Sequence, residues 1–222
     1  MAKAGLKLVQ KGLAKLVPKT EAQQVWKDTI ESNTISFGLG PAGCGKTHIP
    51  VAMAVEGYIK GLYDKIVIVR PAIEACHEKL GSLPGDMFDK MSPHLQSVFD
   101  CMYDYWTPNE ILRLVEENQI EIVPISFMRG RTFRNAFIVA DESQNLTEDM
   151  MLMLITRLGE GSKMVIEGDL DQNDLPRNSK SGLHKALKLV RLVEGINVFQ
   201  FTSKDIVRHP LLQPIIEAWP TL

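Results

Sequence analysis

A glycine-rich stretch that ends in lysine and threonine is the strongest chemical signal in the sequence. It consists of Gly40, Pro41, Ala42, Gly43, Cys44, Gly45, Lys46 and Thr47, which is the GxxxxGK(S/T) spacing of a phosphate-binding loop. The glycines let the backbone turn so that amide N–H groups and the following helix N-terminus face the phosphates. Lys46 is expected to reach the β and γ phosphates, and Thr47 to give its hydroxyl to Mg²⁺. The stretch therefore predicts a nucleotide site that uses magnesium.

A second signal is the pair Asp141 and Glu142, which directly follows an apolar run at 136–140. If that run is a strand of a parallel sheet, both carboxylates emerge at the carboxyl edge, where ligands bind. Asp141 suits magnesium, directly or through water, because hard cations take carboxylate oxygen. Glu142 is a candidate for orienting and deprotonating an attacking water. Adjacent acids also cap helices, so it is the phosphate loop upstream that favours the catalytic interpretation.

A polar amide follows a third apolar run. Gln172 comes shortly after residues 164–167, in the segment Gly168, Asp169, Leu170, Asp171 and Gln172. At the end of another parallel strand it is a candidate sensor of the γ phosphate. An ordinary turn rich in Gly and Asp has the same composition, so this signal is weaker than the first two.

A basic cluster lies just before the carboxylate pair. It consists of Arg129, Arg131 and Arg134, interleaved with Phe127 and Phe133. Arginines contact nucleic-acid phosphates and aromatic rings stack on bases, so the cluster indicates a surface for RNA or single-stranded DNA. Arg70 and Lys79 are further candidates for this surface. The alternative is that the rings pack in the core and the arginines are solvated, and Arg131 is also a candidate for reaching across a subunit interface.

The elements that must position these residues alternate between two kinds. Apolar, β-branched runs predict strands at 35–39, 66–69, 120–125, 136–140, 164–167 and 196–201. Amphipathic segments predict helices at 21–31, 47–60, 93–106, 108–118, 147–158 and 180–193. Strands that are apolar on both faces belong inside a parallel sheet covered by helices. The pattern therefore predicts an α/β fold with a mostly parallel sheet sandwiched by helices.

Composition limits the remaining classes. The 222 residues carry 25 Lys plus Arg against 27 Asp plus Glu, and the net charge of -2 excludes a uniformly basic nucleic-acid coat. No apolar run approaches the roughly 18 to 20 residues of a membrane span, and no secretory signal is recognised, so we expect a cytoplasmic protein without a membrane partner. Five lysines and no acid among residues 1–19 predict a basic, flexible N-terminal arm before a single domain at 20–222.

Together these motifs resemble the PhoH-like ATPases, P-loop proteins that are similar to superfamily 1 helicases. The resemblance extends from about residue 18 to 214. It rests on the phosphate loop and on residues 70–72, 80–86, 128–132, 141–145, 168–172 and 207–210. It implies a RecA-like core, binding and hydrolysis of ATP with Mg²⁺, and action on RNA or single-stranded nucleic acid. It also implies that Gln23 reads adenine. The chain departs from the family pattern at Cys76, His77 and Ser82, which puts the nucleic-acid-facing loop in question.

Size suggests how such an ATPase would work. A helicase motor usually closes two RecA-like lobes on ATP, and a chain of this length has room for one. We therefore expect a homo-oligomeric ring, such as a hexamer, in which Arg208 of one protomer reaches the neighbour's γ phosphate. A nucleotide-gated oligomeric binding protein with slow hydrolysis and no unwinding is the alternative. A P-loop kinase ranks last, because Glu142 beside Asp141 favours water as the acceptor.

Overall fold

The computed structural model describes residues 15–71, 95–172, 174–176, 179–207 and 218. Lys79 and Arg208 lie outside the described residues, as do Cys76, His77, Ser82 and residues 1–14 of the expected arm. Leu16 is buried against the domain, and its backbone N–H donates to Glu56 Oε1 at 2.6 Å. The chain is therefore packed on the domain from at least this residue onward.

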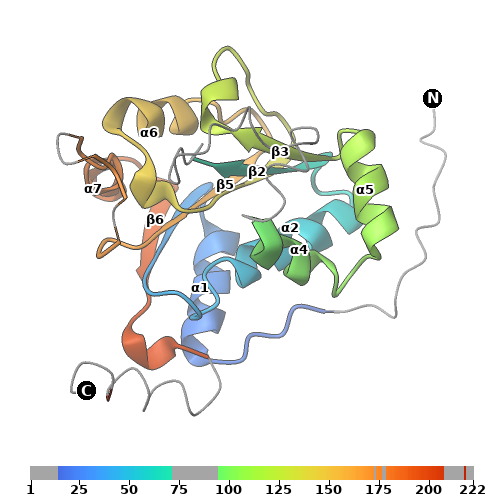
Figure 1. Cartoon of the computed structure of the whole chain (residues 1–222), viewed down its shortest axis with the longest axis horizontal. Coiled ribbons are helices and arrows are strands. Elements are labelled where there is room, and N and C mark those ends of the chain that lie inside the picture. Colours follow the sequence, from blue (N-terminus) through green and yellow to red (C-terminus); the bar gives the residue numbers. More distant parts are fainter. Residues whose placement is uncertain (1–14, 72–94, 173, 177–178, 208–217, 219–222) are drawn as a thin grey trace.

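Six strands form one sheet, seen almost edge-on in Figure 1. In chain order they are β1 (Ile35–Leu39), β2 (Lys65–Arg70), β3 (Ile120–Pro124), β4 (Ala136–Ala140), β5 (Lys163–Gly168) and β6 (Ile196–Gln200). The order across the sheet is β3-β2-β4-β5-β1-β6, and every pair is parallel. The expected α/β class, with a parallel sheet sandwiched by helices and a glycine-rich loop after β1, is confirmed.

Alternation along the strands supplies a hydrophobic core on each face of the sheet. In β4, Phe137 and Val139 belong to one core, whereas Ala136, Ile138 and Ala140 belong to the other. All five residues of this strand are buried, as are all five of β1. Burial on both faces is what apolar, β-branched strands of a parallel sheet require.

Helices cover both faces (Figure 1). The first core is completed by α1 (Glu21–Ser32), α2 (His48–Ile59), α4 (Gln96–Met102) and α5 (Pro108–Glu116). The second is completed by α6 (Glu148–Ile155) and α7 (Leu183–Ala186). Short 3-10 turns are η3 (Ile125–Phe127), η4 (Ser143–Asn145), η5 (Leu187–Arg191) and η6 (Ser203–Asp205). None of the helices in the described part of the chain has the length and apolar character needed to cross a membrane.

The strands follow the predicted runs closely, whereas several helices are shorter than predicted. The segment predicted at 180–193 divides into α7 and the 3-10 turn η5. The helix predicted at 108–118 ends at Glu116, and Asn118 then adopts a positive φ of 56°. Asparagine tolerates this left-handed conformation better than most residues, so it suits a helix end.

The strand order brings four carboxyl ends together. β5 lies between β1 and β4, with Leu39 opposite Gly168 and Ala140 opposite Ile166. β2 lies on the other side of β4, with Val69 opposite Ala140. Residues that follow β1, β2, β4 and β5 therefore meet at one edge of the sheet, the edge at which parallel α/β proteins bind ligands.

Candidate nucleotide site

The loop after β1 depends on glycine at three positions. Gly40, Gly43 and Gly45 have φ values of 138°, 88° and 94°, a region that other residues rarely adopt. The Gly40 N–H donates to the carbonyl of Gly168 at 3.1 Å. A Cβ on Gly40 would lie 2.7 Å from the Cβ of Phe201. The close approach of two neighbouring strands therefore requires glycine where the loop begins.

Gln23 of α1 supports the loop from below. Its Nε2 donates to the Cys44 carbonyl at 3.1 Å, and its Oε1 accepts the Lys19 N–H at 2.8 Å. The residue is only 5% exposed, and a Cβ on Gly45 would come within 2.5 Å of its Nε2. Both ends of the carboxamide are thus already hydrogen bonded, and adenine reading by Gln23 stays a prediction.

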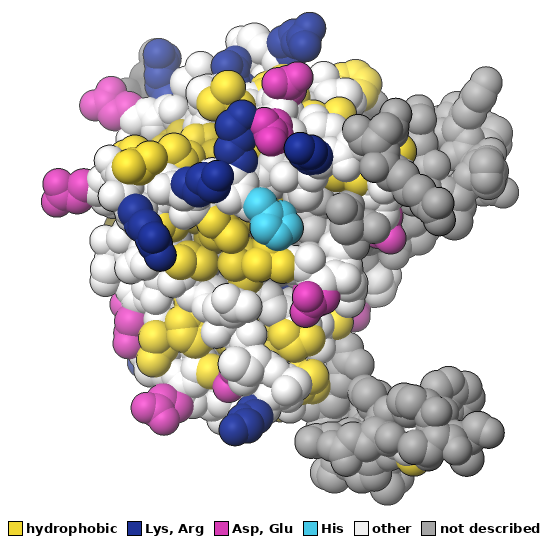
Figure 2. Space-filling model, turned by 90° about the vertical axis from the view of Figure 1, so that its left-hand side faces the viewer, with side chains coloured by type: hydrophobic (Ala, Val, Ile, Leu, Met, Phe, Trp, Pro, Cys, Tyr) yellow, Lys and Arg dark blue, Asp and Glu magenta, His cyan; other side chains and the backbone are white. Residues whose placement is uncertain are grey.

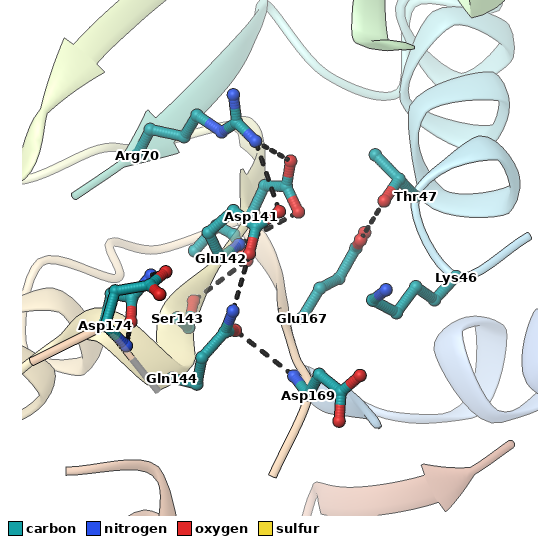
Figure 3. A network of polar contacts seen from close by, with 12 residues as sticks. Lys46, Thr47, Arg70, Asp141, Glu142, Ser143, Gln144, Glu167, Asp169 and Asp174 are labelled. Carbon is teal, nitrogen blue, oxygen red and sulfur yellow. Dashed lines mark hydrogen bonds and ion pairs between the residues drawn. The ribbon is translucent and has the colours of Figure 1, made fainter. Parts of the chain in front are cut away.

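Two further hydrogen bonds fix the loop backbone. The indole Nε1 of Trp26 donates to the Lys46 carbonyl at 3.2 Å. The Val207 N–H, which follows β6, donates to the Gly43 carbonyl at 3.0 Å. The ammonium of Lys46 has a long contact of 3.4 Å with the Pro41 carbonyl. Its side chain extends toward the carboxylates in Figure 3, which leaves it available to phosphate oxygens.

Asp141 and Glu142 follow β4, as predicted, and Arg70 joins them from the end of β2. The Arg70 guanidinium lies 3.2 Å from Asp141 Oδ2 and 3.4 Å from Glu142 Oε1. Burial raises the pKa of Asp141, an effect that Arg70 partly offsets. Arg70 was predicted as a nucleic-acid residue, but the structure directs its side chain to the two carboxylates (Figure 3). The Arg70 Nε is buried without a hydrogen-bond partner among the described residues.

A short polar network joins the segments after β4 and β5. Glu142 has a positive φ of 53°, and its Oε2 accepts from Gln144 Nε2 at 2.6 Å. The Gln144 Oε1 accepts the Asp169 N–H at 3.2 Å. One residue further on, Asn145 donates to Asp174 Oδ2 at 3.1 Å and accepts its N–H at 3.0 Å. The candidate base is therefore connected to the segment that was predicted to sense phosphate.

Glu167 is a site residue that the sequence interpretation missed. It belongs to β5, is 0% exposed, and accepts the Thr47 hydroxyl through Oε2 at 2.6 Å. Its Oε1 is buried without a partner among the described residues. Burial and the nearby negative charge of Asp141 raise the pKa of Glu167 well above its usual value. The available signal was an acid inside an otherwise apolar strand, which costs free energy unless it is used.

Cys44 and Gln172 lie at opposite extremes of exposure. Cys44 is fully buried in the loop, and burial raises the pKa of its thiol despite the nearby Lys46. This outcome fits a small space-filling residue rather than a reactive thiolate.

Gln172 is exposed in the turn after β5, where its N–H has a long contact of 3.4 Å with the Asp169 carbonyl. Its sensing role stays a prediction.

The predicted basic cluster is only partly exposed. Arg129 and Arg134 are exposed, but Arg131 forms an ion pair with Glu121 and lies 4.6 Å from the Phe133 ring centroid. Phe133 itself is buried in the core, so it is not available for base stacking. The core-packing alternative therefore holds for this ring.

Phe127, in contrast, is 60% exposed at the end of η3. Beside it lies an open pocket of about 280 Å³ along the edge strand β3, with Arg131 in its lining. Among the described residues, the accessible part of the predicted nucleic-acid surface is therefore Phe127 with the exposed Arg129 and Arg134.

A second basic surface was not predicted. α7 and η5 contribute Lys185, Lys188 and Arg191 on the side of the molecule that also carries α6 and β6. Figure 2 shows this side, where basic side chains gather above patches of apolar ones. Lys185 forms an ion pair with Glu148 of α6 at 2.5 Å. The available signal is three basic residues within seven positions, inside the segment predicted as a helix at 180–193.

The arrangement fits a nucleotide with magnesium. Thr47 offers a hydroxyl, Asp141 a carboxylate, and Glu167 a buried oxygen without a partner among the described residues. Within the described ranges no three His, Cys, Asp or Glu side chains form a metal cage by themselves. Magnesium commonly binds through one or two protein ligands, with phosphate and water completing its shell. The residues present suit that kind of site.

Comparison with known proteins places these features in a family. Residues 15–220 match the family model described as PhoH-like protein. The chain is 44% identical over 202 residues to a PhoH-like protein of Mycobacterium tuberculosis, covering 91% of this chain and 57% of that protein. It is 44% identical to a PhoH-like protein of Bacillus subtilis, covering 90% and 63%. It is 38% identical to Protein PhoH of Escherichia coli K12, covering 92% and 58%.

The chain thus spans about three fifths of the length of these curated relatives. Among solved structures, it is similar to the Pif1 helicase from Candida albicans, with a TM-score of 0.45 and 11% identity. That match covers 93% of this chain and 44% of the helicase. A similarity this low supports no argument about function.

Proposed function

Because the chain belongs to the PhoH-like family, we propose that it is a magnesium-dependent ATPase that acts on RNA or single-stranded nucleic acid in the cytoplasm. The family and the phosphate loop indicate a nucleotide-binding NTPase. The choice of ATP, the hydrolysis and the nucleic acid are our proposal. The relatives extend beyond the aligned region, so these activities are proposed for this chain on the basis of its own residues.

The observation that carries the proposal is the meeting of the phosphate loop with two carboxylates at one edge of the sheet. Backbone amides of the loop and Lys46 are suited to stabilise charge on transferring phosphate oxygens. Thr47 and Asp141 are suited to hold magnesium, which would neutralise phosphate charge and orient the γ phosphate. Glu142 emerges beside them and is suited to take a proton from an attacking water. This combination favours water over a small acceptor.

The contacts of Glu142 support a slow basal rate. Its carboxylate is held by Gln144 at 2.6 Å and lies 3.4 Å from Arg70. A general base must be within hydrogen-bonding distance of the water, and two donors compete for its oxygens. We infer that turnover requires a rearrangement that frees Glu142, and that nucleic acid or a neighbouring protomer supplies it.

The nucleic-acid part of the proposal rests on the accessible end of the predicted surface. Phe127 is exposed beside the pocket along β3, and Arg129 is exposed next to it. An exposed ring with nearby guanidinium groups suits a stacked base with its phosphates. Lys79 and Arg134 remain further candidates, and Arg70 is now assigned to the nucleotide site instead.

An oligomer is the third part of the proposal. We infer a homo-oligomeric ring, with six protomers as the working number, in which Arg208 enters the neighbour's site. Val207, the residue before it, is hydrogen bonded to the phosphate loop of its own protomer. This contact brings Val207 beside the phosphate loop of its own protomer, so the role of Arg208 at the neighbour's site is proposed from the family resemblance.

Steady-state ATPase activity, with and without single-stranded RNA and DNA at fixed salt, tests the proposal. Lys46→Ala and Glu142→Gln are each expected to lower the rate by about 10² to 10⁴-fold, because they remove charge stabilisation and the base. Lys60→Ala is the matched control, since Lys60 is an exposed lysine at the far end of α2. Its rate should equal that of the wild type.

The outcomes separate the two functions under consideration. A rate that rises with nucleic acid, and that both substitutions abolish, supports an ATPase that acts on nucleic acid. Magnesium-dependent turnover that ignores nucleic acid would favour the nucleotide-gated oligomeric binding protein. Wild-type activity in Glu142→Gln would refute the assignment of the base.

A further inference from the structure

Glu167 is a fully buried acid that follows three apolar residues of β5. It is 0% exposed in the middle of the sheet, and the residues before it in β5 are Met164, Val165 and Ile166, all buried. Its Oε1 has no hydrogen-bond partner among the described residues. A buried polar atom without a partner costs free energy, so its retention calls for a ligand or a function.

The other oxygen of Glu167 acts on the phosphate loop. Oε2 accepts the hydroxyl proton of Thr47 at 2.6 Å, across 120 residues of sequence. A threonine hydroxyl has one proton to donate and two lone pairs that can accept or ligate. Because the proton is committed to Glu167, both lone pairs of Thr47 Oγ1 remain available to a metal ion.

The strand order places this carboxyl within the candidate site. β5 lies between β1, which leads to Thr47, and β4, which leads to Asp141. Figure 3 shows Glu167 between the two loop residues on one side and Asp141 on the other. The carboxylate of Asp141 is already contacted by Arg70 at 3.2 Å and by the Glu142 N–H at 2.9 Å. The unpartnered Glu167 oxygen is therefore the least committed acidic oxygen beside Thr47.

We propose that Glu167 is a positioning residue of the magnesium site, which orients the Thr47 hydroxyl and offers its free oxygen to a metal-bound water. The inference rests on the proposed nucleotide site and extends it to a residue outside the phosphate loop and the carboxylate pair. Magnesium keeps several waters when it binds a nucleotide, so acceptors around those waters contribute to its affinity. Loss of such outer partners typically lowers metal affinity about 10 to 100-fold.

A purely structural carboxyl would behave differently. If Glu167 only stabilised the fold, its replacement would lower the unfolding temperature and leave the effect of magnesium on nucleotide binding intact. If it positions the metal site, its replacement must weaken nucleotide binding in magnesium more than in chelator. The difference between these two conditions is therefore the decisive quantity.

The experiment is calorimetric titration of the full chain with ADP, once in Mg²⁺ and once in EDTA, alongside thermal unfolding. Glu167→Gln keeps the size of the side chain and replaces the carboxyl group by an amide. It is expected to lower the magnesium-dependent gain in ADP affinity by about tenfold or more, with binding in EDTA changed less than about twofold. Glu121→Gln is the matched control, because Glu121 is likewise a hydrogen-bonded acid of the sheet, but it is only partly buried and lies in the edge strand β3.

An unchanged magnesium-dependent gain in Glu167→Gln would overturn the inference. If that variant does not fold, Glu167→Asp takes its place, because the shorter side chain keeps a carboxyl group but withdraws it from Thr47. The same loss is expected, and an unchanged magnesium-dependent gain would again refute the inference. The proposed function fails separately, if the wild type binds no ADP in magnesium, and the inference then falls with it. If the wild type binds ADP in magnesium and the Glu167 variant keeps the same magnesium-dependent gain in affinity, only the inference is refuted.

Discussion

Replacement of Gln23 by alanine is expected to destabilise the protein and to weaken the binding of adenine and guanine nucleotides equally. The carboxamide is hydrogen bonded at both ends, to the Cys44 carbonyl at 3.1 Å and to the Lys19 N–H at 2.8 Å. In this arrangement Gln23 stabilises the phosphate loop, which every nucleotide uses. If it instead read adenine, as the family resemblance implies, only adenine nucleotides would lose affinity.

The size of the effect follows from these contacts. Each buried hydrogen bond contributes about 1 kcal/mol net, and the Cys44 carbonyl left without its donor adds a further penalty. We therefore expect the free energy of unfolding to fall by about 2 to 3 kcal/mol. For a domain of this size that corresponds to a decrease in Tm of roughly 4 to 12 °C. Gly45→Ala should act on the same contact from the other side, because its Cβ would lie 2.5 Å from Gln23 Nε2.

Thermal unfolding followed by titration with ADP and GDP in magnesium measures both effects. Gln24→Ala is the matched control, since Gln24 is the next residue of α1 and its side chain donates an exposed hydrogen bond to Asp28. It should leave the Tm and both affinities unchanged. A selective loss of ADP affinity in Gln23→Ala, with normal GDP affinity and Tm, would refute the loop-stabilising interpretation.

Two further predictions concern titrating groups. In a Cys76→Ser variant, Cys44 and Cys101 should resist maleimide at neutral pH and react after unfolding in urea, because both are buried and burial raises the pKa of Cys101 to about 12; rapid labelling of the native protein would contradict this. Burial disfavours the charged form of Glu121, but hydrogen bonds from Lys65 and Arg131 outweigh this effect, so the pKa of Glu121 lies below its usual value. The stability that Glu121 contributes through these partners is present above the ordinary carboxyl pKa and is lost as pH falls through the pKa of the folded state. Between about pH 5 and pH 3, the free energy of unfolding measured in urea should therefore fall more for the wild type than for Glu121→Gln.

The parts of the site that lie close together in sequence were predictable. The phosphate loop is a local motif, and the strand before it and the helix after it have distinct hydrophobic patterns. Asp141 and Glu142 were predictable for the same reason, since an apolar strand that ends in two acids within a parallel sheet places them at the ligand edge.

The parts that depend on strand order were not predictable from local patterns. Arg70 contacts the carboxylates because β2 pairs with β4, and Glu167 reaches Thr47 because β5 lies between β1 and β4. No periodicity in the sequence specifies these neighbours. Helix ends were also poorly predicted, because a left-handed residue such as Asn118 or a change to 3-10 geometry in η5 depends on local backbone and tertiary packing.

The hydrogen bond from the Val207 N–H to the Gly43 carbonyl links nucleotide binding at the loop to the position of the segment after β6. A nucleotide that shifts the loop at Gly43 changes the free energy of this bond, and with it the preferred path of the chain after β6. Conversely, a partner that displaces Val207 changes nucleotide affinity by the same factor, because coupling between two binding events is symmetric. A single backbone contact thus gives whatever binds this segment a means of sensing whether the loop is occupied.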